Sequence, residues 1–251
     1  MITPAAGKRL IAKAMLKHKA VNSALKKGTL VIIAGTTNGY IAQEILKKIN
    51  AANDFSFNHF FRGVILPPTK NVNEQGRVVD ESQFPGDVVI VNGVWQKGKT
   101  IFDVIDNLKE GDVILKGANA VNLQNNQAGI LIGHPKSGTI GVALQVVMGK
   151  RVELIIPVGL EKRVFVDLNV LSNKINAPGA HGYRLFPISG NIITELEAIF
   201  LLTNTHAEII SAGGIGGAEG SCLLAVSGTE EEENNAEKLI TEIANEPAFR
   251  I

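Results

Sequence analysis

The sequence predicts an α/β protein in which a mostly parallel, doubly wound sheet is followed by a small α+β lobe. Short β-branched apolar runs alternate with amphipathic stretches, and glycine-rich turns separate them. This alternation is typical of β-α-β units, whose helices return the chain to the same end of a parallel sheet. Towards the carboxyl end the order changes to helix, strand, strand, helix. We therefore expect a sheet domain over residues 1–162 and the lobe over residues 163–251.

Composition restricts the class of protein. Of the 251 residues, 45% are hydrophobic and 20% are charged, proportions typical of a water-soluble globular chain. Lys and Arg number 25 against 24 Asp and Glu, so bulk charge does not indicate nucleic-acid binding. No apolar run is long enough for a membrane span, and the single cysteine, Cys222, excludes an internal disulfide. We expect a cytoplasmic protein that binds neither nucleic acid nor membrane.

The elements of the expected sheet domain follow from periodicity. Residues 5–27 predict one or two amphipathic helices, because apolar residues recur at helical spacing with lysines between them. The short apolar run 29–34 ends in glycine and predicts a buried strand, followed by a turn and a helix over 40–49. Further strands are expected at 60–67, 87–95, 112–116, 128–132 and 151–158, and further helices at 99–109 and 140–148. The polar segment 70–86 is a long connection, which is typical of functional loops.

The expected lobe contains a helix at 192–202, strands at 207–212 and 221–227, and a helix at 230–245 with an acidic start. A strand at 163–168 would complete a β-α-β-β-α set that resembles a ferredoxin-like unit. Residues 213–220 superficially match the G-x-G-x-x-G dinucleotide fingerprint, but a strand rather than a helix follows them. We interpret this segment as a wide hairpin loop, with a subunit contact as a second interpretation.

The first candidate site lies between the strand 29–34 and the helix after it, in the segment Gly35-Thr36-Thr37-Asn38-Gly39. Small residues allow a ligand to approach the backbone, and the free N–H groups of a helix start favour an anion. In open α/β sheets, ligands bind beyond the carboxyl ends of the strands, where this turn lies. The segment therefore predicts an anion site, and the alternative is an ordinary helix cap.

The second candidate site is the loop 133–139, which also precedes a predicted helix. It combines the cation Lys136 with Ser137, Gly138 and Thr139, but it lacks the G-K-[S/T] order of a nucleoside-triphosphate loop. His134 in the same loop is the strongest acid–base candidate, because an imidazole exchanges protons near neutral pH. The alternative is a purely structural turn.

The third candidate site, Lys116-Gly117-Ala118-Asn119, follows the strand 112–116, and its lysine is a further candidate catalytic residue. The other histidines carry weaker signals, although His181 lies in a glycine-containing loop that could cover a site. No histidine or cysteine pair has the spacing of metal ligands. We therefore expect no metal, and we expect no cofactor.

Together these segments resemble one large superfamily. It contains ribose-5-phosphate isomerase, glucosamine-6-phosphate deaminase, CoA transferases, methylthioribose-phosphate isomerase, the related initiation-factor exchange subunits and the sensor domains of DeoR-type repressors. Gly35-Thr36-Thr37 resembles the phosphate loop, and Gly117–Val121 resembles the G-A-D-x-(I/V) strand end. Gly138-Thr139 resembles a helix start of the methylthioribose-phosphate isomerase branch. Glu161-Lys162-Arg163 resembles the lysine-bearing segment after the last strand, so the resemblance covers roughly Thr29–Arg163.

The resemblance implies a Rossmann-like fold, a sugar-phosphate ligand and a homo-oligomer. It also implies that Gly35, Thr36, Thr37, Asn38, Asn119 and Lys162 contribute to one ligand site, together with the loop residues Lys136, Ser137, Gly138 and Thr139. However, the superfamily's aspartate is replaced here by Asn119, and the next polar position is Asn122. An amide cannot transfer protons near neutral pH, although it can bind a hydroxyl.

Two functional hypotheses follow. In the first, the protein binds a phosphorylated or carboxylated sugar-like metabolite and isomerises it by proton transfer, with His134 and Lys116 as the catalytic groups. In the second, it is a non-catalytic metabolite sensor, or a regulatory or assembly protein. Cys222 lies inside an apolar run and is expected to be inert core in either case.

Overall fold

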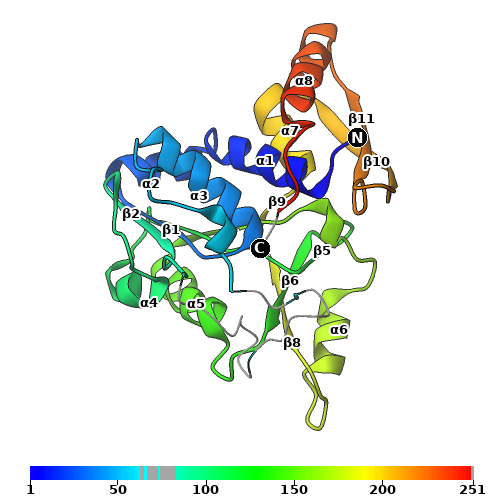
Figure 1. The fold of residues 1–251 in the computed structure, drawn as a ribbon. Helices are drawn as coiled ribbons and strands as arrows, with labels where there is room; N and C mark the ends of the chain where they lie inside the picture. The colour runs from blue at the N-terminus through cyan, green and yellow to red at the C-terminus, as the bar shows by residue number, and fades with distance from the viewer. Residues whose placement is uncertain (63–64, 67–72, 74–82, 250–251) are drawn as a thin grey trace.

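The computed structural model describes residues 1–62, 65–66, 73 and 83–249 (Figure 1). The helices are α1 (Pro4–Met15), α2 (Lys19–Lys27), α3 (Thr36–Lys48), α4 (Ile101–Val104), α5 (Gly138–Lys150), α6 (Leu168–Ile175), α7 (Glu195–Thr203) and α8 (Glu230–Ile243). The 3₁₀ turns are η1 (Phe57–His59), η2 (Ile105–Asn107) and η3 (Leu160–Lys162). The strands are β1 (Thr29–Ile32), β2 (Val88–Val91), β3 (Val94–Trp95), β4 (Val113–Leu115), β5 (Ala120–Asn122), β6 (Gln127–Ile132), β7 (Glu153–Pro157), β8 (Arg184–Ser189), β9 (Asn191–Ile193), β10 (His206–Ala212) and β11 (Cys222–Ser227).

A six-stranded sheet with the order β3-β2-β1-β4-β7-β9 forms the centre of the molecule. Strands β1, β4, β7 and β9 run parallel, whereas β2 and β3 are antiparallel additions at one edge. The chain is therefore a mixed α/β protein with a mostly parallel central sheet. Among the described residues, no helix combines the length and the apolar character that a membrane span requires.

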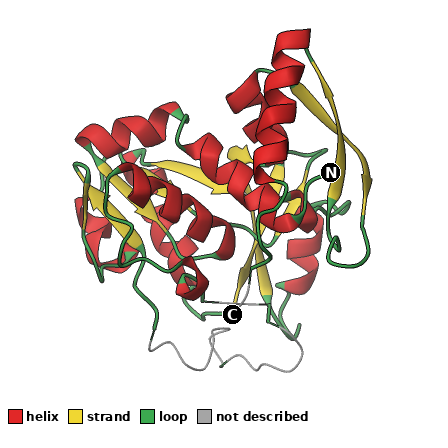
Figure 2. Ribbon diagram, turned by 45° about the horizontal axis from the view of Figure 1, so that its top comes forward, coloured by secondary structure: helices red, strands yellow, loops and turns green. Residues whose placement is uncertain are grey.

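Helices cover both faces of this sheet (Figure 2). Successive side chains of a strand point to opposite faces, so Leu30 and Ile32 of β1 pack in one core with α1 and α3. Val31 and Ile33 pack in a second core with residues of α4 and α5. A strand buried on both faces has to be apolar throughout, which explains the uninterrupted run that predicted β1.

One expected strand is a hairpin. The sequence analysis treated 87–95 as a single strand, but β2 and β3 are antiparallel neighbours joined by Asn92 and Gly93. Both residues have positive φ angles, 48° and 79°, as a tight two-residue hairpin turn requires. The Asn-Gly pair was the signal that this expectation missed.

A second, antiparallel sheet has the order β5-β6-β8. Strand β6 was expected to continue the parallel series, but it pairs along its whole length with β8. Gly190 alone separates β8 from β9, which joins the central sheet beside β7. Backbone pairing therefore crosses the expected boundary at residue 162, because β8 and β9 pair with strands that precede it.

Three further expectations differ from the structure. The strand expected at 163–168 is absent: Arg163 makes a single bridge with Val121, and Asp167 then caps α6 through the N–H groups of Asn169 and Val170. The first residues of the helix expected at 192–202 are strand β9. Of the strand expected at 60–67, residues 60–62 and 65–66 are not strand and the others lie outside the described residues, as does most of the segment 70–86.

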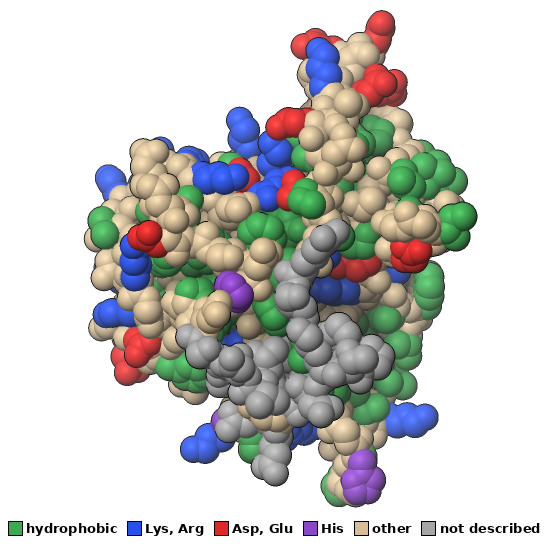
Figure 3. Space-filling view, in the orientation of Figure 1, with side chains coloured by type: hydrophobic (Ala, Val, Ile, Leu, Met, Phe, Trp, Pro, Cys, Tyr) green, Lys and Arg blue, Asp and Glu red, His purple; other side chains and the backbone are tan. Residues whose placement is uncertain are grey.

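The carboxyl-terminal part contains the β10–β11 hairpin, which contacts α7 and α8. The glycine-rich segment 213–220 connects its strands, as the hairpin interpretation predicted. The acidic run is also confirmed as a helix start, because Thr229 and Glu232 form a reciprocal cap at the first turn of α8. Figure 3 shows the Asp and Glu side chains at that end of the molecule.

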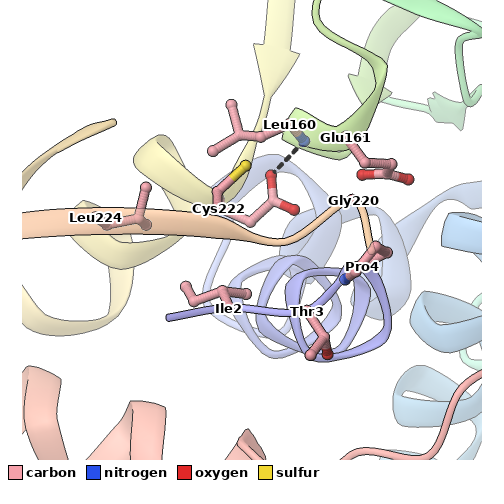
Figure 4. Close-up of a pocket in the computed structure, with 9 residues that line it drawn as sticks. Ile2, Thr3, Pro4, Leu160, Glu161, Gly220, Cys222 and Leu224 are labelled. Atoms are coloured by element: carbon pink, nitrogen blue, oxygen red, sulfur yellow. Dashed lines mark hydrogen bonds between the residues drawn. The ribbon is translucent and has the colours of Figure 1, made fainter. Parts of the chain in front are cut away.

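A buried carboxylate pair joins the amino terminus to the rest of the fold (Figure 4). Glu161 of η3 accepts a 2.7 Å hydrogen bond from Lys8 of α1, and Glu195 of α7 accepts one of 2.8 Å from the backbone N–H of Leu160. Burial, reinforced by the negative charge of Glu161, raises the pKa of Glu195 to about 7. The small cavity beside the pair, which Cys222 also lines, has no room for water.

This pair predicts a pH-dependent effect of Glu195→Gln. The Glu195 carboxyl binds its proton more tightly in the folded state, so its contribution to stability is complete below about pH 4.5 and is lost as pH rises through about 7. A glutamine cannot ionise, so at about pH 8 the variant should be more stable than wild type by roughly 2–3 kcal/mol, with little difference near pH 4. Urea unfolding at both pH values measures this. The exposed Glu208→Gln is the control, and an equal effect at both pH values would contradict the prediction.

Candidate functional site

A cleft of about 540 Å³ lies beyond the carboxyl ends of β1 and β4. The segments that follow these two strands line it, and the start of α5, strand β6 and η3 complete its walls. The structure therefore brings the three candidate segments of the sequence together. The predicted site residues that line the cleft are Gly35, Thr36, Thr37, Asn38, Lys116, Asn119, His134, Ser137, Gly138, Thr139 and Lys162.

Two predicted residues are not part of the cleft. Lys136 is exposed and does not line it, although the neighbouring Ser137 and His134 do. Its assignment to ligand binding therefore stays a prediction that the lining of the cleft does not support. His181 is exposed in the connection between α6 and β8 and does not line the cleft either.

The start of α3 presents uncapped backbone to the cleft. Its cap residue is Gly35, and within the described part of the chain no side chain accepts a hydrogen bond from its first turn. Among these residues, the segment therefore lacks the side-chain cap that the alternative of an ordinary helix cap would supply. Thr37 and Asn38 are buried, and neither Thr37 Oγ1 nor Asn38 Oδ1 has a hydrogen-bond partner among the described residues. Such orphan groups are costly to bury without a ligand or water.

The side-chain amide of Asn38 stabilises the backbone around the cleft. Its Nδ2 group donates to the carbonyl oxygens of Ile33, at 2.8 Å, and Leu115, at 3.0 Å. These carbonyls are at the ends of β1 and β4, so the amide holds together the two strand ends that carry the site. Sequence analysis assigned Asn38 to ligand binding, and the described contacts assign its Nδ2 group to positioning.

The start of α5 is the second uncapped helix end. Its cap residue Ser137 has a left-handed backbone with φ 60°, and its side chain makes no capping bond. The backbone N–H of Lys136 donates to His134 Nδ1 at 3.0 Å. This bond makes Nδ1 the acceptor, so in a neutral His134 the proton is on Nε2, which is able to donate.

Two lysines bring positive charge to the cleft. Lys116 follows β4 and its Nζ lies 3.3 Å from the Gly117 carbonyl oxygen, while Lys162 Nζ donates to Ala118 at 2.9 Å. The pKa of Lys116 is lowered to about 8, mainly by burial and in addition by the positive charges of Lys162 and Arg62. The negative charge of Asp87 acts in the opposite direction and offsets part of this shift. Burial also lowers the pKa of Lys162. These amines are therefore unusually ready to lose a proton or to pair with an anion.

Asn119 contributes an amide donor. Its Oδ1 accepts a 3.0 Å hydrogen bond from the backbone N–H of Leu131, and its Nδ2 makes no hydrogen bond to the described residues. The amide nitrogen can therefore serve a ligand. By contrast, Asn122 is buried and does not line the cleft: it donates to the Val166 carbonyl oxygen and accepts from Asn125 N–H.

Sequence reasoning missed Arg62, Asp87 and the two phenylalanines that line the cleft, Phe61 and Phe249. Arg62 lines the cleft, and its guanidinium lies 4.5 Å from the centre of the Phe84 ring. Asp87 is fully buried and accepts from the N–H groups of Ala34 and Ile101, and burial raises its pKa. No motif marks these residues, since their partners are distant in sequence. The cluster of phenylalanines around residue 60 is a visible signal in the sequence, but it does not by itself distinguish the wall of a cleft from buried core.

The fold and the cleft define an α/β protein with a preformed, positively charged site at the carboxyl edge of its sheet. Comparison with protein-family models, curated proteins and solved structures finds no match to this chain.

The two bonds of Asn38 predict a stability effect of Asn38→Ala. The substitution leaves the carbonyls of Ile33 and Leu115 buried without these donors, which should destabilise the protein by roughly 2–4 kcal/mol. Asn22 is a matched control, since it also donates to two carbonyls but is only half-buried, so water can replace it. Urea unfolding of Asn38→Ala and Asn22→Ala checks this. Equal losses would show that Asn38 has no special role.

Proposed function

We propose that the protein binds a small metabolite with a phosphate or carboxylate group in this cleft. The proposal rests mainly on the convergence of two uncapped helix starts, of α3 and α5, on one cleft that also contains Lys116 and Lys162. Helix N-termini offer free N–H groups and a positive dipole end, and ammonium groups add full charge. No Asp or Glu lines the cleft among the described residues, so no carboxylate of that part of the chain repels an anion there.

The proposal includes the isomerisation of a sugar-like substrate by proton transfer. Lys116 supports it, because an amine with a pKa of about 8 is partly neutral near physiological pH and can accept a proton from carbon. His134 lines the same cleft, and the proton on its Nε2 supports a role as the donor to a carbonyl oxygen. From the resulting enediol, Lys116 would return its proton to the former carbonyl carbon while the hydroxyl on the adjacent carbon gives its proton to His134, so the carbonyl moves by one position and both groups regain their starting protonation.

Proton transfer predicts deuterium incorporation. Sugar phosphates incubated with the protein in D₂O should exchange the hydrogen next to the carbonyl, and Lys116→Met should abolish this exchange, since methionine has no ionisable group. NMR of the recovered sugar phosphates measures the effect, with Lys136→Met as the control at an exposed lysine outside the cleft. Binding without exchange would exclude the isomerase proposal and leave the sensor.

A non-catalytic sensor is the second candidate function. The amide of Asn119, where the resembling enzymes have an aspartate, and the lack of a carboxylate among the described lining residues both favour it. Such a site would retain anion affinity without the acid that turnover in those enzymes requires.

Anion binding itself predicts a characteristic pH dependence. Sulfate is a suitable probe because its charge is constant around neutrality, and a bound anion raises the melting temperature. As pH rises from about 7 to about 9, Lys116 loses its proton, and sulfate affinity should fall by about tenfold. In Lys116→Met the affinity should be low at both pH values, while Lys136→Met should behave as wild type. Thermal-shift titrations check this, and sulfate binding with no pH dependence would remove Lys116 from the site.

A further inference from the structure

The cleft has an apolar half that a bare anion leaves empty. Besides the polar helix starts, its lining includes Phe61, Phe249, Ile130 and Ile132 of β6, and Ile140 from the first turn of α5. A volume of about 540 Å³ is within the range of pockets for drug-sized ligands, whereas phosphate alone occupies a small part of it. Apolar surface that faces an open cleft is stabilised when a ligand removes it from water.

Phe249 reaches the cleft from the far end of the chain. Figure 1 shows the segment after α8 running back across the molecule to end beside α3. The ring of Phe249 packs against Phe57, with centroids 5.9 Å apart, and against Phe61 edge-to-face at 5.8 Å. These contacts make Phe61 and Phe249 one aromatic wall, at the side of the cleft formed by residues that follow η1.

A buried arginine holds the segment that carries Phe249. Arg9 of α1 binds both carboxylate oxygens of Glu246, at 3.0 and 2.8 Å. The same guanidinium donates to Glu44 at 2.6 Å and to Gln43 at 2.8 Å, both on α3. A bidentate arginine–carboxylate pair of this kind fixes the relative orientation of the two side chains as well as their distance. The aromatic wall is therefore tied to α3, the same helix whose start faces the cleft.

We infer that the ligand is an amphipathic anion: a phosphate monoester or carboxylate whose flat apolar body lies against Phe61 and Phe249. This inference rests on the proposed function, because the anion end is the site already described. It adds the ligand class, since the aromatic wall favours an anion that also carries a flat apolar group, whether or not the same molecule has the sugar-like carbonyl that proton transfer requires. Flat rings pack well against aromatic edges and faces, and burying them adds affinity in proportion to their apolar area.

Calorimetric titration with four probes tests the inference: inorganic phosphate, ribose 5-phosphate, phenyl phosphate and 1-naphthyl phosphate. We expect affinity to rise in that order, with 1-naphthyl phosphate binding at least about tenfold more tightly than ribose 5-phosphate. Phe249→Ala should remove most of this preference for the aryl esters. Phe200→Ala, at an exposed phenylalanine of α7 outside the cleft, is the matched control and should retain it.

Phe249→Leu keeps an apolar side chain at this position but removes the flat ring. It therefore tests whether the ring of Phe249 causes the aryl preference, even where Phe249→Ala does not fold. It should bind phenyl and cyclohexyl phosphate equally, whereas wild type should prefer phenyl phosphate. Phosphate binding without any aryl preference, or a preference that survives in both Phe249 variants, would overturn this inference and leave the proposed function intact. No binding of any probe would overturn both.

Discussion

The side-chain amide of Asn38 holds the geometry on which the cleft depends. It is fully buried and donates to the last carbonyls of two neighbouring parallel strands, from Ile33 and Leu115. Asn38 also belongs to the first turn of α3, so one side chain joins β1, β4 and the helix start. The residue after Leu115 is Lys116, whose amine reaches the cleft. The start of α3 and the Lys116 cation thus share a single anchor, and neither can shift without breaking a buried hydrogen bond.

Charge is distributed unequally between the cleft and its surroundings. The lysines in the cleft have acidic partners in Asp87 and Glu161, but neither carboxylate lines the cleft. Asp87 uses its oxygens on backbone N–H groups, and Glu161 is paired with Lys8. These carboxylates therefore offset part of the cost of burying the two cations without entering the lining of the cleft, so the charged groups in its described lining are positive.

The sequence predicted those features that depend on local pattern. The apolar runs of β1, β4 and β7 marked buried strands, and the rule that parallel strands end at one edge correctly joined the segments after β1 and β4. The pairing of strands that are distant in sequence could not be predicted. A short apolar run such as β6 has the same pattern in a parallel and an antiparallel sheet, and β9 has only three residues, too few to be recognised as a strand before α7. Arg62 and Phe249 were missed for a related reason, because distant segments place them in the cleft.

The single-residue link between β8 and β9 has a mechanical consequence. Gly190, with a φ of 136°, connects the antiparallel sheet directly to the central one. Strand β6, which pairs with β8, supplies one wall of the cleft, and the segments after β1 and β4 supply the facing wall. So short a tether couples β8 to β9, and through them it couples the sheet that carries β6 to the central sheet. We expect these two described walls of the cleft to keep their relative positions when a ligand binds, so that selection among ligands depends on fit rather than on closure.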